Sequence, residues 1–118
     1  MKLYQYPKCS TCRKASKFLS SNEIEYQSID ITEQPPTKDE LNAMLTSYDG
    51  EIRRLFNTSG VQYRELNMKD KLPTMSAEEA IDLLATNGKL IKRPFLLNCA
   101  GAGIVGFKEA DWQTFIEG

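Results

Sequence analysis

The chain has 118 residues, a length that suits one domain with its own core. Its 15 basic and 16 acidic residues give a net charge of −1, which argues against a general nucleic-acid binder and against attraction to an anionic membrane surface. No apolar run approaches the length of a spanning helix, and the first residues form a strand pattern, not a signal peptide. Three cysteines do not form a secreted disulfide framework, so any disulfide should be transient. We expect a cytoplasmic monomer that contacts neither nucleic acid nor a membrane directly.

The first predicted unit is a strand, a helix and a second strand. The strands are expected over residues 2–6 and about 25–30, and the helix over about 10–21. Ala15, Phe18 and Leu19 fall on one helix face at the spacing of buried positions. A strand, a helix and a strand within some thirty residues form a right-handed crossover, so the two strands should be parallel.

The middle of the chain is predicted to be helical. Thr37 and Glu40 form a capping box that starts a helix over residues 38–46. Ser76 and Glu79 form a second capping box, whose helix ends at Asn87-Gly88. Between these helices, the pattern predicts a shorter helix from 51 to about 57 and short helical or irregular pieces over 61–66 and 67–72.

The last part is predicted to be an antiparallel hairpin followed by a helix. Two apolar runs, residues 95–97 and 104–107, flank a glycine-rich loop, and the final helix covers about 108–116. The element order β-α-β, helical block, β-β-α is that of a thioredoxin-like α/β fold. We expect a single domain over residues 1–118, with a four-stranded mixed sheet, helices on both faces and a helical insertion at about 33–89.

The strongest functional signal is Cys9-Ser10-Thr11-Cys12, after the first strand and at the start of a helix. Two thiols three residues apart on a first helical turn face the same side and can close a disulfide. Unpaired N–H groups and the positive end of the helix dipole favour a thiolate there, lowering a cysteine pKa from about 8.5. The alternatives are half a zinc site or two structural cysteines. Zinc needs a second close pair of ligands, whereas the chain has no histidine and one further cysteine, Cys99. We interpret the motif as a redox pair and expect no metal or organic cofactor.

Motifs along nearly the whole chain resemble one family. They are Tyr6-Pro7-Lys8-Cys9-Ser10-Thr11-Cys12-Arg13-Lys14-Ala15, Leu55-Phe56-Asn57-Thr58-Ser59-Gly60, Tyr63-Arg64-Glu65-Leu66, Leu90-Ile91-Lys92-Arg93-Pro94-Phe95-Leu96-Leu97 and Val105-Gly106-Phe107. In this order they resemble the arsenate reductase (ArsC)/Spx family, including its small bacterial members of the Spx/MgsR type or related to arsenate reductase. The combination is far more specific than a lone Cys-x-x-Cys.

The resemblance implies roles for individual residues. It makes Cys9 the nucleophile, with Cys12 as the second thiol of a redox pair, and it implies a cis peptide bond before Pro94, facing the cysteine loop. By itself Pro94 could be an ordinary proline at the start of a strand. Arg93 is the best candidate for an anion-binding side chain, because a guanidinium suits an oxyanion and favours a nearby thiolate. The simpler alternative is a solvated arginine.

The loop around Cys9 contains further candidates for stabilising the thiolate or an anion. They are Ser10, Thr11 and Arg13. Arg13 could add a second positive charge, or it could lie on the exposed helix face with Lys14. Cys99 could be a resolving or glutathionylated thiol, although a lone loop cysteine is more often incidental.

Two departures from the family's reductase pattern limit the expected activity. The resemblance implies two further anion-binding arginines, at positions where this chain has Asn57 and Gly106-Phe107. Losing two charge-assisted contacts of about 1.5–3 kcal/mol each would weaken arsenate binding strongly. Arsenate turnover is therefore doubtful, and Cys12 brings the chain closer to the Spx-like members.

Two functions remain open from the sequence. The first is a thiol-dependent oxidoreductase coupled to glutaredoxin, thioredoxin or a low-molecular-weight thiol, in which Cys9 attacks and Cys12 resolves. The second is a redox-sensing transcriptional regulator of Spx type that binds the RNA polymerase alpha subunit. A neutral charge and the absence of the basic C-terminal stretch expected of Spx favour the first.

Overall fold

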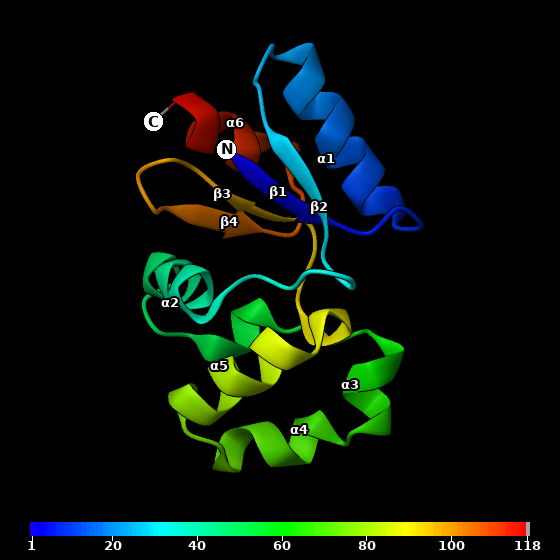
Figure 1. The fold of residues 1–118 in the computed structure, drawn as a ribbon, viewed down its shortest axis with the longest axis vertical. Helices are drawn as coiled ribbons and strands as arrows, with labels where there is room; N and C mark the ends of the chain where they lie inside the picture. The colour runs from blue at the N-terminus through cyan, green and yellow to red at the C-terminus, as the bar shows by residue number, and fades with distance from the viewer. Residues whose placement is uncertain (118) are drawn as a thin grey trace.

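The computed structural model describes residues 1–117, and its strands form one four-stranded mixed sheet (Figure 1). The strand order is β2-β1-β3-β4, with β1 parallel to β2 and antiparallel to β3, and with β3 antiparallel to β4. The predicted thioredoxin-like α/β class is confirmed. The strands and α-helices are β1 (Lys2–Gln5), α1 (Ser10–Ser21), β2 (Gln27–Asp30), α2 (Lys38–Ser47), α3 (Val61–Glu65), α4 (Met68–Lys71), α5 (Ala77–Thr86), β3 (Phe95–Leu97), β4 (Gly103–Val105) and α6 (Glu109–Glu117).

The sheet separates two apolar layers, as the two-residue period of its strands requires. Leu3 and Leu96 point to the side covered by α1 and α6, where they pack with Trp112. Tyr4 and Phe95 point to the opposite side and pack with the helical block. Figure 1 shows this arrangement, with α1 and α6 above the sheet and α2 to α5 below it.

Both predicted capping boxes are present. The Thr37 N–H donates to Glu40 Oε1 at 2.9 Å, and the Glu40 N–H donates to Thr37 Oγ1 at 3.2 Å. Ser76 and Glu79 form the same pair of hydrogen bonds, each at 3.1 Å. Each box satisfies N–H groups that a helix start otherwise leaves unpaired, and so it defines where α2 and α5 begin.

The helical block is tied to the segment before β3. The 3-10 helix η1 covers Ile52–Leu55, and the chain is then extended because Phe56 forms an antiparallel bridge with Ile91. The predicted helix over 51–57 was therefore too long. On either side of the bridge, Asn57 N–H donates to Leu90 O and Lys92 N–H donates to Leu55 O, both at 2.7 Å. These bonds hold η1 beside the residues that lead to Arg93.

The edge strand β4 is shorter than predicted and is protected by α2. It ends at Val105 because Gly106 has φ +68°, a backbone conformation that favours glycine and turns the chain out of the sheet. The N–H of Gly103 donates to Ser47 Oγ at 3.1 Å, and that of Val105 donates to Tyr48 Oη at 2.9 Å. The end of α2 thus satisfies donors that an open edge would offer to another chain.

No helix within residues 1–117 is both long enough and apolar enough to cross a bilayer.

Candidate active site

Cys9 is the N-cap residue of α1, at the carboxyl end of β1. Its own N–H donates to Tyr6 O at 3.0 Å, which closes the loop between strand and helix. Its sulfur accepts the backbone N–H of Cys12 at 3.3 Å, in the place where a Ser, Thr or Asp oxygen usually caps a helix. The sulfur therefore lies against the first turn of α1, where the helix leaves N–H groups unpaired.

The two thiols of the motif have opposite environments. Cys9 is partly exposed, whereas Cys12 is fully buried. Burial by itself raises the pKa of Cys9, but contacts with the Cys12 thiol and N–H and with the Arg93 guanidinium outweigh it and lower that pKa. Burial, followed by the hydrogen bond to Cys9 and the Cys9 charge, raises the pKa of Cys12 to about 12. Cys9 is thus the thiol that ionises first, and Cys12 keeps its proton.

Arg93 lies beside Cys9, at the cis peptide bond that the resemblance implied before Pro94. Its guanidinium carbon is 5.0 Å from the centroid of the Tyr6 ring, a cation–π distance that holds the charge over the cysteine loop. None of the ion pairs within residues 1–117 includes Arg93. Its charge is therefore available to the thiolate or to an anionic ligand.

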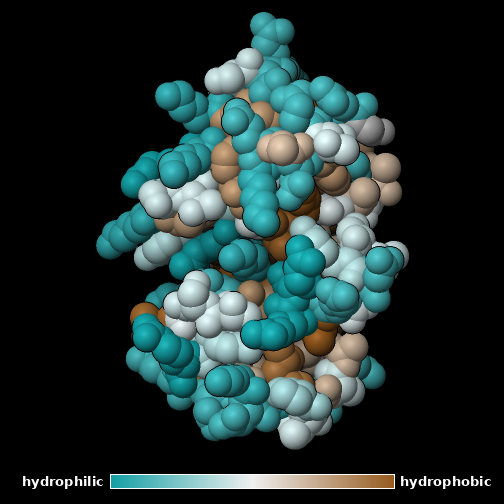
Figure 2. All heavy atoms as spheres, turned by 180° about the vertical axis from the view of Figure 1, so that it is seen from behind, coloured by the Kyte–Doolittle hydropathy of each residue, from teal (hydrophilic) through white to brown (hydrophobic). Residues whose placement is uncertain are grey.

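A cleft of about 1100 Å³ opens beside Cys9. The start of α1, the end of α2, β4 and α6 border it, and Thr11 and Arg93 line it with Cys9. Figure 2 shows this side of the molecule, where the surface is hollowed between the sheet layer and the helical block and hydrophilic atoms border hydrophobic ones. A cleft of this size exceeds what a single oxyanion fills, so it can hold a larger ligand with its reacting atom at Cys9.

Three further cations line the cleft that the sequence interpretation did not identify: Arg54, Lys92 and Lys108. The Arg54 guanidinium carbon lies 4.7 Å from the centroid of the Tyr48 ring. Because the Tyr48 hydroxyl also accepts the Val105 N–H, one tyrosine positions both β4 and this arginine. For Arg54, the signal in the sequence was the pair Arg53-Arg54, but nothing local distinguishes which of the two lines the cleft.

The other residues considered for the site either lie outside the cleft or add no charge to it. Arg13 does not line the cleft; it lines a separate hollow of about 330 Å³ and donates to Pro7 O at 3.4 Å. Ser10 is exposed in the first turn of α1. Asn57 and Gly106, where the resemblance implied arginines, do line the cleft.

Cys99 is at the other end of the sheet from Cys9. It is exposed in the loop after β3, whose last residue, Leu97, pairs with Lys2 at the start of β1. Cys9 follows the end of β1, so the strand separates the two thiols. Within residues 1–117 no three His, Cys, Asp or Glu side chains gather as a metal site.

Comparison with known proteins agrees with the fold. The model of the ArsC family matches residues 4–115. The chain belongs to the ArsC family. It is 50% identical to the uncharacterised protein YusI of Bacillus subtilis over 93% of this chain and 92% of YusI. It is 30% identical to the regulatory protein MgsR of the same organism, over 80% of this chain and 74% of MgsR. A crystal structure of an ArsC-family-related protein from Bacteroides fragilis superposes with a TM-score of 0.88 at 48% identity, over 96% of this chain and 94% of that one.

Proposed function

We propose that this ArsC-family protein is a thiol-dependent oxidoreductase that uses Cys9 as nucleophile and Cys12 as resolving thiol. The observation that carries the proposal is the asymmetry of the pair. Cys9 is partly exposed beside a cationic cleft and has a lowered pKa, whereas Cys12 is buried behind it with a raised pKa. A nucleophile must be ionised and reachable, whereas a resolving thiol should stay protonated until the first step has occurred.

The first step is thiol–disulfide exchange at Cys9. The Cys9 thiolate attacks one sulfur of a substrate disulfide, the substrate S–S bond breaks, and the second substrate sulfur leaves as a thiolate that takes up a proton. Arg93 stabilises the anionic nucleophile and an anionic leaving group in turn.

The second step uses the change in charge at Cys9. Once Cys9 is part of a mixed disulfide it no longer carries the charge that helps to raise the pKa of Cys12. Cys12 then loses its proton more easily and attacks the Cys9 sulfur. The remaining substrate thiolate leaves, and two electrons have passed from the Cys9–Cys12 pair to the substrate. An external dithiol or two thiols restore the pair.

The proposal places the protein in the cytoplasm, where glutaredoxin, thioredoxin or low-molecular-weight thiols can supply these electrons. Arsenate is not the substrate we favour. Of the three arginines implied by the resemblance, Arg93 is retained, and Asn57 and Gly106 occupy the other two places in the cleft.

The test uses a neutral disulfide, bis(2-hydroxyethyl) disulfide, with mass spectrometry of the intact protein. Cys12→Ser should accumulate the Cys9 mixed disulfide, whereas the unmodified protein should lose two hydrogens and contain the Cys9–Cys12 bond. Cys99→Ser is the matched control and should behave like the unmodified protein. A predominant Cys9–Cys99 bond would contradict the assignment of Cys12.

A redox-sensing regulator that binds the RNA polymerase alpha subunit is the second candidate, supported by the 30% identity to the regulatory protein MgsR. The same dithiol would then act as a switch without turnover. A pull-down with and without diamide separates the two functions. Recovery of polymerase subunits that depends on oxidation would favour the regulator, and recovery of thiol reductants would favour the enzyme.

A further inference from the structure

The charges of this nearly neutral chain are strongly segregated. All 16 acidic residues fall within 23–82 and 109–117, so that residues 1–22 and 83–108 contain basic charges alone. Nine of the 15 basic residues lie in these two acid-free segments. They are Lys2, Lys8, Arg13, Lys14, Lys17, Lys89, Lys92, Arg93 and Lys108. Although the net charge is only −1, the acidic residues are confined to two segments of the chain and most basic residues lie in the other two.

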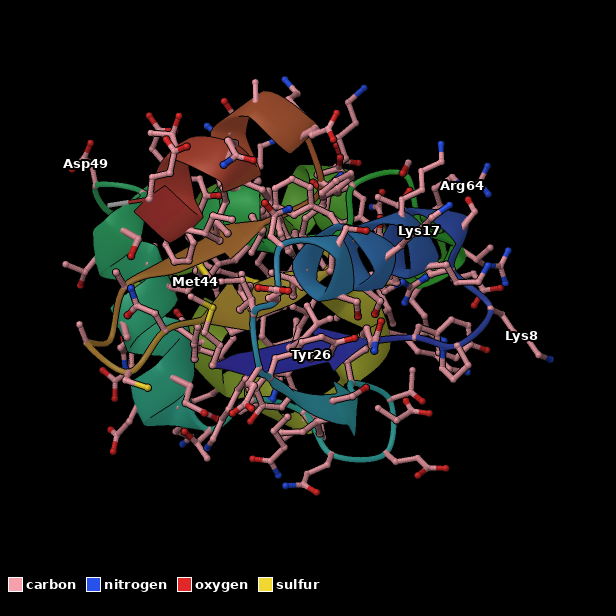
Figure 3. The ribbon with its side chains drawn as sticks, turned by 90° about the horizontal axis from the view of Figure 1, so that it is seen from above. Lys8, Lys17, Tyr26, Met44, Asp49 and Arg64 are labelled. Carbon is pink, nitrogen blue, oxygen red and sulfur yellow. The ribbon has the colours of Figure 1, made fainter. Side chains whose placement is uncertain are left out.

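Most of these nine charges lie in the loop before α1, on α1 itself or in the lining of the Cys9 cleft. Six of them form what we call the basic rim. The basic rim consists of Lys8, Arg13, Lys14, Lys17, Lys92 and Arg93. In Figure 3, Lys8 projects from the loop before α1, Lys17 lies further along that helix, and Arg64 lies at the same end of the molecule. Asp49 lies at the opposite end.

No residue of the basic rim forms an ion pair within residues 1–117, and the acidic residues that share its hollows are Asp111, in the cleft lining, and Asp30, beside Arg13. The ion pairs found in residues 1–117 are Lys2–Glu40, Lys38–Asp82 and Arg54–Glu51. Lys8, Arg13, Lys14 and Lys17 are exposed. Clustered cations without partners repel one another and produce a positive potential that steers an anionic partner to this face.

An apolar side chain accompanies these charges. Val61 lines the cleft with Cys9 and is 58% exposed, the one large hydrophobic residue described as exposed between residues 1 and 117. An apolar contact inside a polar, charged border is the usual composition of a protein–protein interface. Nucleic acid could bind the positive charges, but it would leave Val61 without an apolar partner. It also contains no thiol or disulfide that could react with Cys9.

We propose that the basic rim and Val61 form the docking surface for an acidic protein that carries the dithiol with which Cys9 exchanges. The proposal rests on the proposed function and adds the chemistry of the partner's surface. A small thiol inside the cleft would not account for Lys8, Lys14 and Lys17, which do not line it. Those charges fit a partner with a footprint larger than the cleft.

At this surface the partner's dithiol would reduce the Cys9–Cys12 disulfide by thiol–disulfide exchange. A partner thiolate attacks the Cys9 sulfur of the Cys9–Cys12 disulfide, whose bond breaks, and Cys12 leaves and takes up a proton. The partner's second thiol then loses its proton and attacks the mixed disulfide, which releases the Cys9 thiolate. The partner ends as a disulfide, and the protein has gained two electrons.

Two synthetic dithiol peptides with the same Cys-Gly-Pro-Cys core test the charge of the partner, one flanked by glutamates and the other by lysines. At low salt the acidic peptide should reduce the Cys9–Cys12 disulfide about tenfold faster than the basic one. The difference should shrink as ionic strength rises to about 0.5 M, because salt screens exposed charges. Dithiothreitol, a neutral dithiol, should show little dependence on salt.

Charge-reversal variants test where on the protein the acidic partner docks. The double substitution Lys14→Glu with Lys17→Glu should remove most of the preference for the acidic peptide and leave reduction by dithiothreitol unchanged. Lys69→Glu with Lys71→Glu, two exposed lysines of α4, is the matched control and should keep the preference. Val61→Asp should slow reduction by the acidic peptide more than it slows reduction by dithiothreitol, because the peptide alone needs the apolar contact.

The outcomes separate this inference from the function on which it rests. If the Cys9–Cys12 disulfide forms and dithiothreitol reduces it, but both peptides react alike and the α1 variant changes nothing, the docking surface is wrong and the redox function stands. If a single-stranded DNA oligonucleotide binds this face more tightly than the acidic peptide, the assignment to a protein partner is overturned. If no disulfide forms at all, the proposed function fails and this inference fails with it.

Discussion

A cysteine and a basic residue lie near each end of strand β1, but their contacts differ between the two ends. At its carboxyl end Cys9 caps α1, and Arg93 is held over the cysteine loop without a carboxylate partner among the ion pairs of residues 1–117. At its amino end Lys2 pairs with Glu40 at 3.1 Å, in a hollow that Cys99 also lines. Polar groups that satisfy one another stabilise a fold, whereas donors and charges directed at a sulfur change its chemistry.

The loops that hold the two cysteines differ in the same way. In the loop after β3, the Asn98 side chain accepts the N–H groups of Ala100 and Ala102 at 2.9 and 3.0 Å. The local donors are thus consumed by the loop itself, and Cys99 is exposed beside them. In the loop after β1, the sulfur of Cys9 is itself the acceptor for the first turn of the helix. Of the two loop cysteines, Cys9 is the one whose sulfur takes the place of the helix cap, a position that favours the thiolate.

The largest expected effect separates these two thiols. Cys9→Ser should reduce disulfide exchange by about three orders of magnitude or more, because the nucleophile is lost. Cys99→Ser should stay within about twofold of the unmodified protein, since β1 lies between the two cysteines. The measurement is the rate of thiol release from bis(2-hydroxyethyl) disulfide. Equal losses in both variants would break the comparison between the two ends.

The second prediction concerns the cation beside Cys9. Arg93→Ala should raise the pKa of Cys9, because it removes a positive charge and a donor that favour the thiolate. Iodoacetamide alkylation from pH 5 to 9 should then begin at higher pH than in the unmodified protein. Arg13→Ala is the control and should shift the profile less, because Arg13 lies in a different hollow and contacts Pro7. A larger shift in Arg13→Ala would reassign the stabilising charge.

The third prediction sharpens the account of the cleft. Arsenate reduction coupled to glutaredoxin or thioredoxin should be weak or absent, and Asn57→Arg should raise any residual rate by adding a charge near Cys9. Thr58→Arg adds the same charge at an exposed position outside the cleft lining and should have no comparable effect. Robust turnover of arsenate by the unmodified protein, with ordinary saturation, would make it an arsenate reductase.

The smallest expected effect concerns Glu40, which pairs with Lys2 at the amino end of β1. Burial raises the pKa of Glu40, but hydrogen bonds from the Tyr4 hydroxyl, the Thr37 N–H and Lys2 outweigh it and lower that pKa. Because the folded-state pKa is depressed, this carboxylate stabilises the fold above its unfolded pKa of about 4.3, and the stabilisation is lost as pH falls through the folded value.

Glu40→Gln should therefore reduce the free energy of unfolding by about 1–2 kcal/mol at pH 7 and by less at pH 3. Urea unfolding at the two pH values measures this difference. Glu33→Gln, at an exposed carboxylate, is the matched control. A loss in Glu40→Gln that is the same at both pH values would show that the hydrogen bonds, and not the charge, matter. Disulfide exchange should be unchanged in both variants.

Much of the fold could be predicted because its determinants are local. The capping boxes at Thr37 and Ser76 define helix starts through hydrogen bonds within four residues. The predictions that were less accurate depended on distant partners. The helix expected to reach residue 57 ends early because Phe56 pairs with Ile91, and the strand expected to reach Phe107 ends early because Gly106 turns the chain toward Trp112, whose Nε1 donates to Gly106 O at 2.8 Å.

The candidate site divides in the same way. Local sequence was sufficient for the Cys9-Ser10-Thr11-Cys12 motif, because a cysteine before a helix meets that helix's own N–H groups, and the family resemblance pointed to Arg93 and Pro94. The tertiary structure alone showed that Arg54, Lys92 and Lys108 share the cleft with Cys9, whereas Arg13 does not. It also showed that Cys12 is buried and Cys9 partly exposed. Spacing along a helix determines which residues face the same way, but burial and the positions of distant charges depend on how β3, β4 and the helical block pack around the loop.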